Sequence, residues 1–126
     1  MKLDQGKYGE VMEKELRVNI YQIVKTQTPE GRTSDDGQTG ADNIREVILN
    51  NWEKYEKIIV SFEGIVKMSR VFVDEAFAKI LEEKSLEEIN KKIYFPDAKE
   101  AIVKDLNSAL KLRKKILNAQ RNREEI

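Results

Sequence analysis

Apolar and polar residues alternate near the start of the chain and predict a β-strand. Positions 16, 18 and 20 are apolar, whereas positions 17 and 19 are polar, which is typical of a strand with one buried face. We predict this strand over residues 15–26. The run KIIVSF at residues 57–62 predicts the central strand of a sheet, covered on both faces. Residues 92–95, stopped by Pro96, predict a third strand.

Helical spacing of apolar residues fills the segments between these strands. We predict helices over residues 40–55, 69–84 and 85–90, and a last helix from Asp97 to about residue 118. Thr39, Ser69 and Asp97 are the expected N-caps, and Ser85 with Glu88 forms a capping box. In the second helix we expect Phe72 and Phe77 in the core and Arg70 on the surface.

The alternation of strands and helices predicts the fold class. It indicates a small α/β layered domain with a short, mostly parallel central sheet and helices packed on it. The 126 residues suit one domain. We expect a loose N-terminal arm over residues 1–13, the domain over 14–118 and a charged, frayed tail over 119–126.

A long loop between the first strand and the first helix is a candidate ligand site. Residues 28–39 read TPEGRTSDDGQT and contain no long apolar side chain. Loops of this length are often functional, although a solvated connector is the common alternative. The loop lacks the order of a P-loop. An anionic ligand could still be held near the expected helix start by a small group of residues, namely Arg32, Thr39, Gly40 and Arg45.

Composition removes several classes of chemistry. The chain has no cysteine and no histidine, so disulfides, Cys–His pairs and Ser-His-Asp triads are impossible, and we predict no metal site or cofactor. Lys plus Arg equals Asp plus Glu at 23 each, and the basic residues of the last helix lack interleaved aromatics, so nucleic-acid binding is not expected. The apolar runs are far shorter than the ~20 residues of a membrane span, and the polar start is unlike a signal peptide. We therefore expect a cytoplasmic protein without a membrane partner.

Three segments carry a resemblance to a known family. They are TGADNIRE at residues 39–46, KIIVSFEGI at 57–65 and SRVFVDEAFAKI at 69–80. Together they resemble the STAS-like family of unknown function, which is related in fold to the STAS domains of anti-anti-sigma factors and sulfate-transporter tails. The resemblance implies a regulatory, non-catalytic module that binds a protein, with an ATPase of the histidine-kinase type as the partner to try first. The alternative is a small-molecule or nucleotide binder, with or without hydrolytic activity, that uses the 28–40 loop.

The same resemblance points to the start of the second helix as the binding surface. The expected partner-binding residues are Met68, Ser69, Arg70, Val71, Val73 and Asp74. STAS antagonists are switched by phosphorylation of a serine here, but Arg70 and Val71 stand where family members often carry small hydroxyl residues. Ser69 is thus a helix cap or a switch. Asp74 and Glu75 are adjacent and point about 100° apart, which disfavours paired carboxylate catalysis. We expect Asp74 to pair with Arg70.

The last helix carries an apolar stripe that suggests self-association. Leu106, Leu110 and Leu117, with Ala109 and Arg113 between them, lie at near-helical spacing on one side of the helix. Trp52 and Tyr55 add apolar surface beyond what three strands were expected to cover. We expect a homodimer with a self-complementary contact through this helix.

Overall fold

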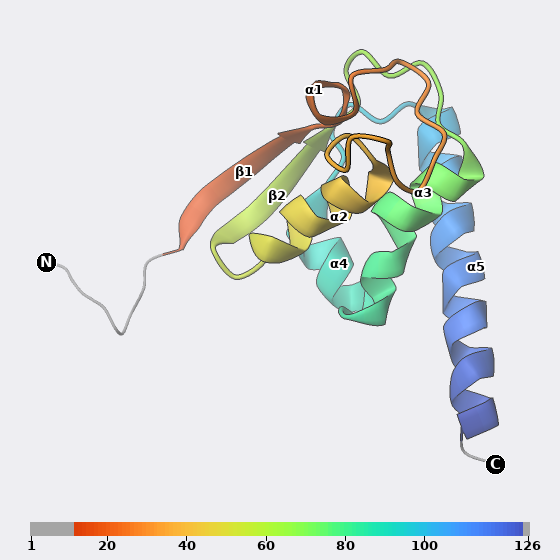
Figure 1. The fold of residues 1–126 in the computed structure, drawn as a ribbon. Helices are drawn as coiled ribbons and strands as arrows, with labels where there is room; N and C mark the ends of the chain where they lie inside the picture. The colour runs from red at the N-terminus through yellow and green to blue at the C-terminus, as the bar shows by residue number, and fades with distance from the viewer. Residues whose placement is uncertain (1–11, 125–126) are drawn as a thin grey trace, which may run out of the picture.

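A three-stranded parallel sheet forms the centre of the chain. The computed structural model describes residues 12–124, and within them β1 (Glu13–Asn19), β2 (Tyr55–Ser61) and β3 (Ile93–Tyr94) lie in the order β1-β2-β3. Figure 1 shows helices packed beside this sheet. The α/β class and the central position of β2 are confirmed. Residues 1–11 of the expected N-terminal arm lie outside the described residues.

Six helical segments connect or follow the strands. They are α1 (Ile20–Val24), α2 (Ala41–Asn50), α3 (Arg70–Ala76), the 3-10 helix η1 (Ala78–Glu82), α4 (Leu86–Lys92) and α5 (Glu100–Glu124). The predicted capping box is present at the start of α4, where Ser85 and Glu88 bond to each other's backbone N–H. The loop between α1 and α2 spans residues 25–40 and includes the turn-rich segment predicted at residues 28–39.

Among residues 12–124, helices cover only one face of the sheet. Leu16 and Val18 of β1 share a face with Ile58 and Val60 of β2 and with Ile93 of β3, and this face meets the helices. The opposite face carries Arg17, Lys57 and Tyr94, all exposed. The prediction that residues 57–62 are covered on both faces is therefore wrong. Because consecutive parallel strands lie side by side, right-handed crossovers place their helices on the same face (Figure 1).

The first predicted strand is shorter than expected. The strand ends at Asn19, whose side chain accepts a hydrogen bond from the Gln22 backbone N–H and caps α1. Ile20 and Val24, four residues apart, are buried on one side of this short helix. Lys25 then ends it in the left-handed conformation with φ of 62°. The capping tendency of Asn19 outweighed the period-2 pattern here.

The predicted helix over residues 69–84 is divided in two. α3 ends at Ala76, and after Phe77 the chain tightens into η1. The break coincides with an aromatic cluster in which the Phe77 ring meets the rings of Phe62 and Phe95 edge-on, with centroids 5.9 and 5.7 Å away. Edge-to-face contacts of this kind add to the stabilisation from burial. As predicted, Phe72 and Phe77 are buried and Arg70 is exposed.

The last helix differs from its prediction at both ends. Asp97 does not cap it, because its carboxylate accepts bonds from the Phe62 N–H and the Ser61 hydroxyl at the end of β2. α5 begins only at Glu100 and continues to Glu124, so most of the expected frayed tail is helical. Residues 111–124 contain neither Gly nor Pro, and Arg121 and Arg123 in the last turn favour the helix dipole.

Candidate functional site

Two acidic residues near the C-terminal end of α3 bind basic side chains from four parts of the chain. We name this group the Asp74–Glu75 cluster, and its members are Asp74, Glu75, Arg32, Arg45, Lys79 and Arg113. Arg32 comes from the 25–40 loop and Arg45 from α2, while Lys79 lies in η1 and Arg113 in α5. The cluster therefore joins the loop and three helical segments to α3.

The contacts are short and connected to each other. Arg32 donates to both carboxylates, with Nη1 at 2.8 Å from Asp74 Oδ2 and 3.0 Å from Glu75 Oε1. Arg113 grips Asp74 with two donors, Nε at 3.0 Å and Nη2 at 2.5 Å. Arg45 lies 2.8 Å from Glu75 Oε2 and also donates to the Glu75 carbonyl oxygen, while Lys79 lies 3.0 Å from Oε1.

The cluster keeps both carboxylates ionised. Burial alone raises the pKa of Asp74, but hydrogen bonds from Arg113 and Arg32 outweigh it, and the pKa is lowered. Burial likewise acts to raise the pKa of Glu75, and the bonds from Arg45, Lys79 and Arg32 reverse the direction. The pKa values of Arg32 and Arg113 are raised, chiefly by their bonds to Asp74. A general acid at neutral pH requires a raised carboxyl pKa, so neither group is tuned for that role.

One expectation about these carboxylates is corrected by the structure. Asp74 pairs with Arg32 and Arg113 in place of Arg70, because Arg70 lies exposed on the first turn of α3. A single nitrogen of Arg32 reaches both carboxylates. Lys79 carried a local signal, since Glu and Lys four residues apart on a helix attract each other. The role of Arg113 had no local signal.

Ser69 caps α3 and ties it to the loop. Its hydroxyl oxygen accepts a bond from the Phe72 N–H at 3.0 Å, and its O–H donates to the Glu30 carbonyl. The Ser69 N–H also donates to the Pro29 carbonyl. The predicted cap is therefore confirmed, and the same hydroxyl holds residues 29–30 against the start of α3.

The start of α3 presents a smaller surface than the sequence suggested. Met68 and Val73 are buried in the core, so neither side chain is available to a partner. Arg70 is exposed and Val71 is 43% exposed, while Ser69 is half-buried between them and the loop. The exposed part of the predicted surface is therefore Arg70 and Val71, with the half-buried Ser69 beside them.

A groove between α3 and α5 lies next to this exposed start. It holds about 260 Å³ and is lined by Arg70, Asp74, Asp105, Ser108, Ala109 and Leu112. Leu112 is 60% exposed and adds apolar surface to this groove. The sequence did not point to the α5 residues of this groove, because which helix packs beside α3 is a property of the tertiary fold.

The four residues expected to hold a ligand, three in the loop and Arg45 in α2, are engaged inside the chain. Arg32 and Arg45 meet at Glu75, so an anion there would compete with a carboxylate for both guanidinium groups. The Thr39 hydroxyl donates to Asp36, and the Gly40 N–H donates to the Asn43 side chain. A side chain at Gly40 would collide with the Thr33 backbone at 2.8 Å, so glycine is needed for this close approach.

The described part of the chain contains neither a metal-binding cluster nor a membrane-spanning helix. Among residues 12–124, no three acidic, histidine or cysteine side chains converge to form a metal-binding group. None of the helices described is both long and apolar enough to cross a membrane.

Comparison with known proteins places the chain in a family. The profile of the STAS-like domain of unknown function (DUF4325) matches residues 40–102, which include α2, β2, α3 and β3. The chain belongs to this family. Searches of curated proteins and of solved structures returned no match. The matched region of this STAS-like domain contains Ser69 and four of the six residues of the Asp74–Glu75 cluster, whereas Arg32 and Arg113 lie outside it.

Proposed function

We propose that this STAS-like domain is a non-catalytic regulatory module that binds another protein through residues 69–71 at the start of α3. The observation that carries the proposal is the exposed pair Arg70 and Val71, presented on a segment whose backbone is held from both sides. Ser69 fixes the segment to the loop, and the Asp74–Glu75 cluster fixes the next turn of α3 to α2 and α5. Rigid presentation lowers the entropy cost of binding.

The neighbouring groove supplies the means of recognition. Val71 and Leu112 offer apolar area, and Arg70 and Asp105 supply a cation and an anion beside it. Apolar contacts surrounded by charged side chains are the usual arrangement at a protein interface. We infer that a partner inserts an apolar side chain between α3 and α5 and pairs an acidic group with Arg70.

The resemblance to STAS domains supports an ATPase of the histidine-kinase type as the partner. The state of the two carboxylates of α3 supports binding over catalysis, since both are ion-paired and have lowered pKa values. Arg32, the loop cation expected to hold an anion, is bound to Asp74 and Glu75, which favours protein binding over the nucleotide-binding alternative.

The proposal is tested by calorimetry, in which the purified chain is titrated with purified ATPases of the histidine-kinase type from the organism that produces it. We expect Val71→Asp to weaken binding at least tenfold, because a buried charge would face an apolar contact. Leu86→Asp is the matched control, since Leu86 is also an exposed apolar residue near a helix start, on α4. Equal binding by wild type and Val71→Asp, or equal losses in both variants, would reject residues 69–71 as the surface.

A further inference from the structure

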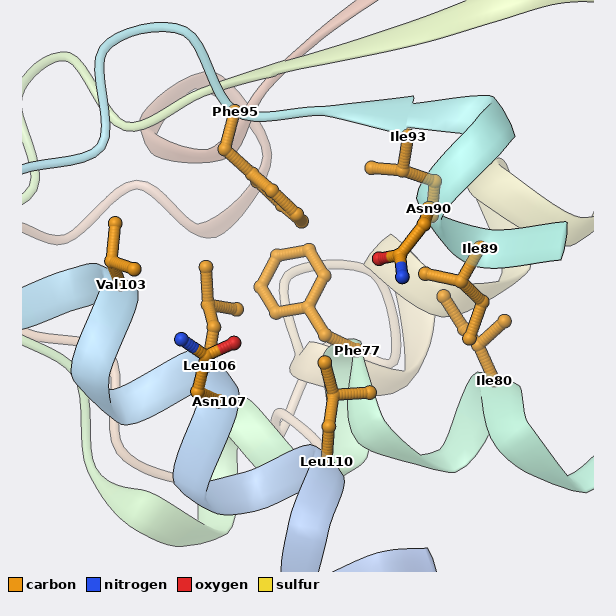
Figure 2. Close-up of a pocket in the computed structure, with 10 residues that line it drawn as sticks. All are labelled: Phe77, Ile80, Ile89, Asn90, Ile93, Phe95, Val103, Leu106, Asn107 and Leu110. Carbon is orange, nitrogen blue, oxygen red and sulfur yellow. The ribbon is translucent and has the colours of Figure 1, made fainter. Parts of the chain in front are cut away.

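A second hollow lies on another side of α5 and is largely apolar. It holds about 150 Å³ between η1, α4, β3 and α5, and Figure 2 shows its lining residues. They are Phe77, Ile80, Ile89, Asn90, Ile93, Phe95, Val103, Leu106, Asn107 and Leu110. α5 lines this cavity with positions 103, 106, 107 and 110, and it lines the groove beside Arg70 with positions 105, 108, 109 and 112. The two sites are therefore separate.

The lining restricts the chemistry of an occupant. Eight of the ten residues are apolar, two are asparagines and none is charged. A charged molecule would lose its hydration here without gaining a counter-ion, which is costly. Asn90 from α4 and Asn107 from α5 lie on opposite sides of Phe77, and each carboxamide offers a donor and an acceptor (Figure 2). The cavity thus suits a neutral molecule with one hydrogen-bonding group.

The volume of the cavity and its aromatic lining residues restrict the class of ligand further. An apolar cavity of about 150 Å³ accommodates a molecule such as benzene. Phe77 and Phe95 line the cavity and already meet edge-on, and Phe95 also stacks on Phe62 with centroids 5.7 Å apart. A planar ring in the cavity would extend this edge-to-face arrangement. Val103 at the cavity is 41% exposed, which leaves apolar surface in contact with water until the cavity is filled.

We propose that this cavity is a binding site for a small, neutral aromatic molecule about the size of benzene or indole. The ring lies between the Phe77 and Phe95 side chains and α5, and its polar group bonds to the carboxamide of Asn90 or Asn107. This site is independent of the proposed docking surface, because none of its lining residues belongs to that surface.

The first experiment is an NMR titration of the full chain with indole, followed on the side-chain methyl groups. We expect saturable shifts confined to methyl groups that line the cavity, with Ile80, Ile89 and Leu106 as the reporters. Indole-3-acetate should bind at least tenfold more weakly, because its carboxylate meets no cation. Shifts spread over the surface, shifts that do not saturate, or equal binding of the anion would overturn the proposal.

Two sets of variants test the geometry. Leu110→Phe fills the cavity and should weaken indole binding at least tenfold, whereas Leu112→Phe, on an exposed position of the same helix, should leave it unchanged. If Leu110→Phe fails to fold, Val103→Phe is the alternative variant that fills the cavity. The double variant Asn90→Leu, Asn107→Leu should weaken indole binding two- to tenfold, the worth of about one hydrogen bond, without weakening benzene binding. Undiminished indole binding by the cavity-filling variants would place the ligand elsewhere.

Discussion

Glu75 is the residue on which the Asp74–Glu75 cluster depends most. Its side chain is only 7% exposed, and it accepts from three basic side chains. A buried carboxylate with this many charge-assisted bonds holds its neighbours in one arrangement. Such a group is costly to disturb, because the cations that remain lose their counter-charge.

Replacing Glu75 by glutamine should lower the free energy of unfolding by about 2–3 kcal/mol. The value lies below the 3–5 kcal/mol of a fully buried pair, because Arg32 and Arg45 retain contact with water. Urea denaturation is the measurement. Glu83→Gln, at an exposed position shortly after η1, is the matched control and should change stability by less than about 0.5 kcal/mol. Equal effects of the two changes would contradict a structural role for the cluster.

The lowered carboxylate pKa values also predict how stability depends on pH. Because the folded-state pKa values of Asp74 and Glu75 lie below their ordinary values of 3.8 and 4.5, both groups stabilise the fold above those values. This contribution is lost as the pH falls through the lowered pKa values. Asp36 adds to the loss at lower pH, since hydrogen bonds from Ser34, Gln38 and Thr39 lower its pKa to about 2.

Unfolding free energies measured from about pH 6 to pH 2 should therefore fall steadily below about pH 4.5. The double variant Asp74→Asn, Glu75→Gln should start from a lower plateau and show a shallower decline, because two of the titrating groups are gone. Parallel curves for the wild type and the double variant would show that the acid sensitivity arises elsewhere, for example at Asp36.

At the level of elements, local interactions such as helix caps could be predicted from the sequence, whereas contacts between distant segments could not. The capping box of Ser85 and Glu88 and the cap of Ser69 are local interactions, and both were predicted from the residue types at the expected helix starts. In the Asp74–Glu75 cluster, Arg32 contacts Glu75 across 43 positions of sequence, and no periodic pattern of residues predicts a contact of this range. α1 was missed because Ile20 fits a strand and a helix equally well until the cap of Asn19 is considered.

The double use of the Ser69 hydroxyl gives a prediction for the 25–40 loop. Ser69→Ala and Ser85→Ala each remove one cap and should each cost about 1 kcal/mol. Only Ser69→Ala also removes the bond to the Glu30 carbonyl, so it should speed hydrogen exchange of amides in residues 29–40. Ser85→Ala should leave that exchange unchanged. If both variants leave the loop equally protected, the other contacts of the loop, such as Arg32 with Asp74, are sufficient to hold it.

At the scale of the whole molecule, the three-layer arrangement expected for a parallel sheet is replaced by two layers. All the crossover helices lie on the face formed by Val18, Ile58 and Val60, and the other face bears charged residues. The central place of β2 was predicted from its apolar run at residues 57–62, but the restriction of the helices to one face of the sheet was not. Trp52, expected to remain as surplus apolar surface, is only 5% exposed and lies beneath the Lys84 and Lys92 side chains.

The packing of α5 against the core argues against the homodimer that we expected from the apolar stripe of the last helix. Leu106 is buried in the core, and Ala109 and Leu110 pack against it. Arg113 is engaged by Asp74 on α3. A dimer formed through this stripe would have to pull α5 away from α3 and η1, exposing the core and breaking an ion pair. The distal half of α5 carries Lys111, Lys114 and Lys115 without acidic partners nearby in sequence, so two copies of it would repel each other.

We therefore expect the isolated chain to sediment as a monomer of about 14.7 kDa at tens of micromolar. The mass measured by sedimentation should not change with protein concentration, and the Leu117→Asp variant should have the same mass as the wild type. Arg113→Met tests the intramolecular role of the stripe: it should lower stability, because Asp74 loses the guanidinium that grips it with two donors. A mass that rises with concentration and returns to that of one chain in Leu117→Asp would instead show that α5 joins two copies, and that its packing against α3 exists only in the separated chain.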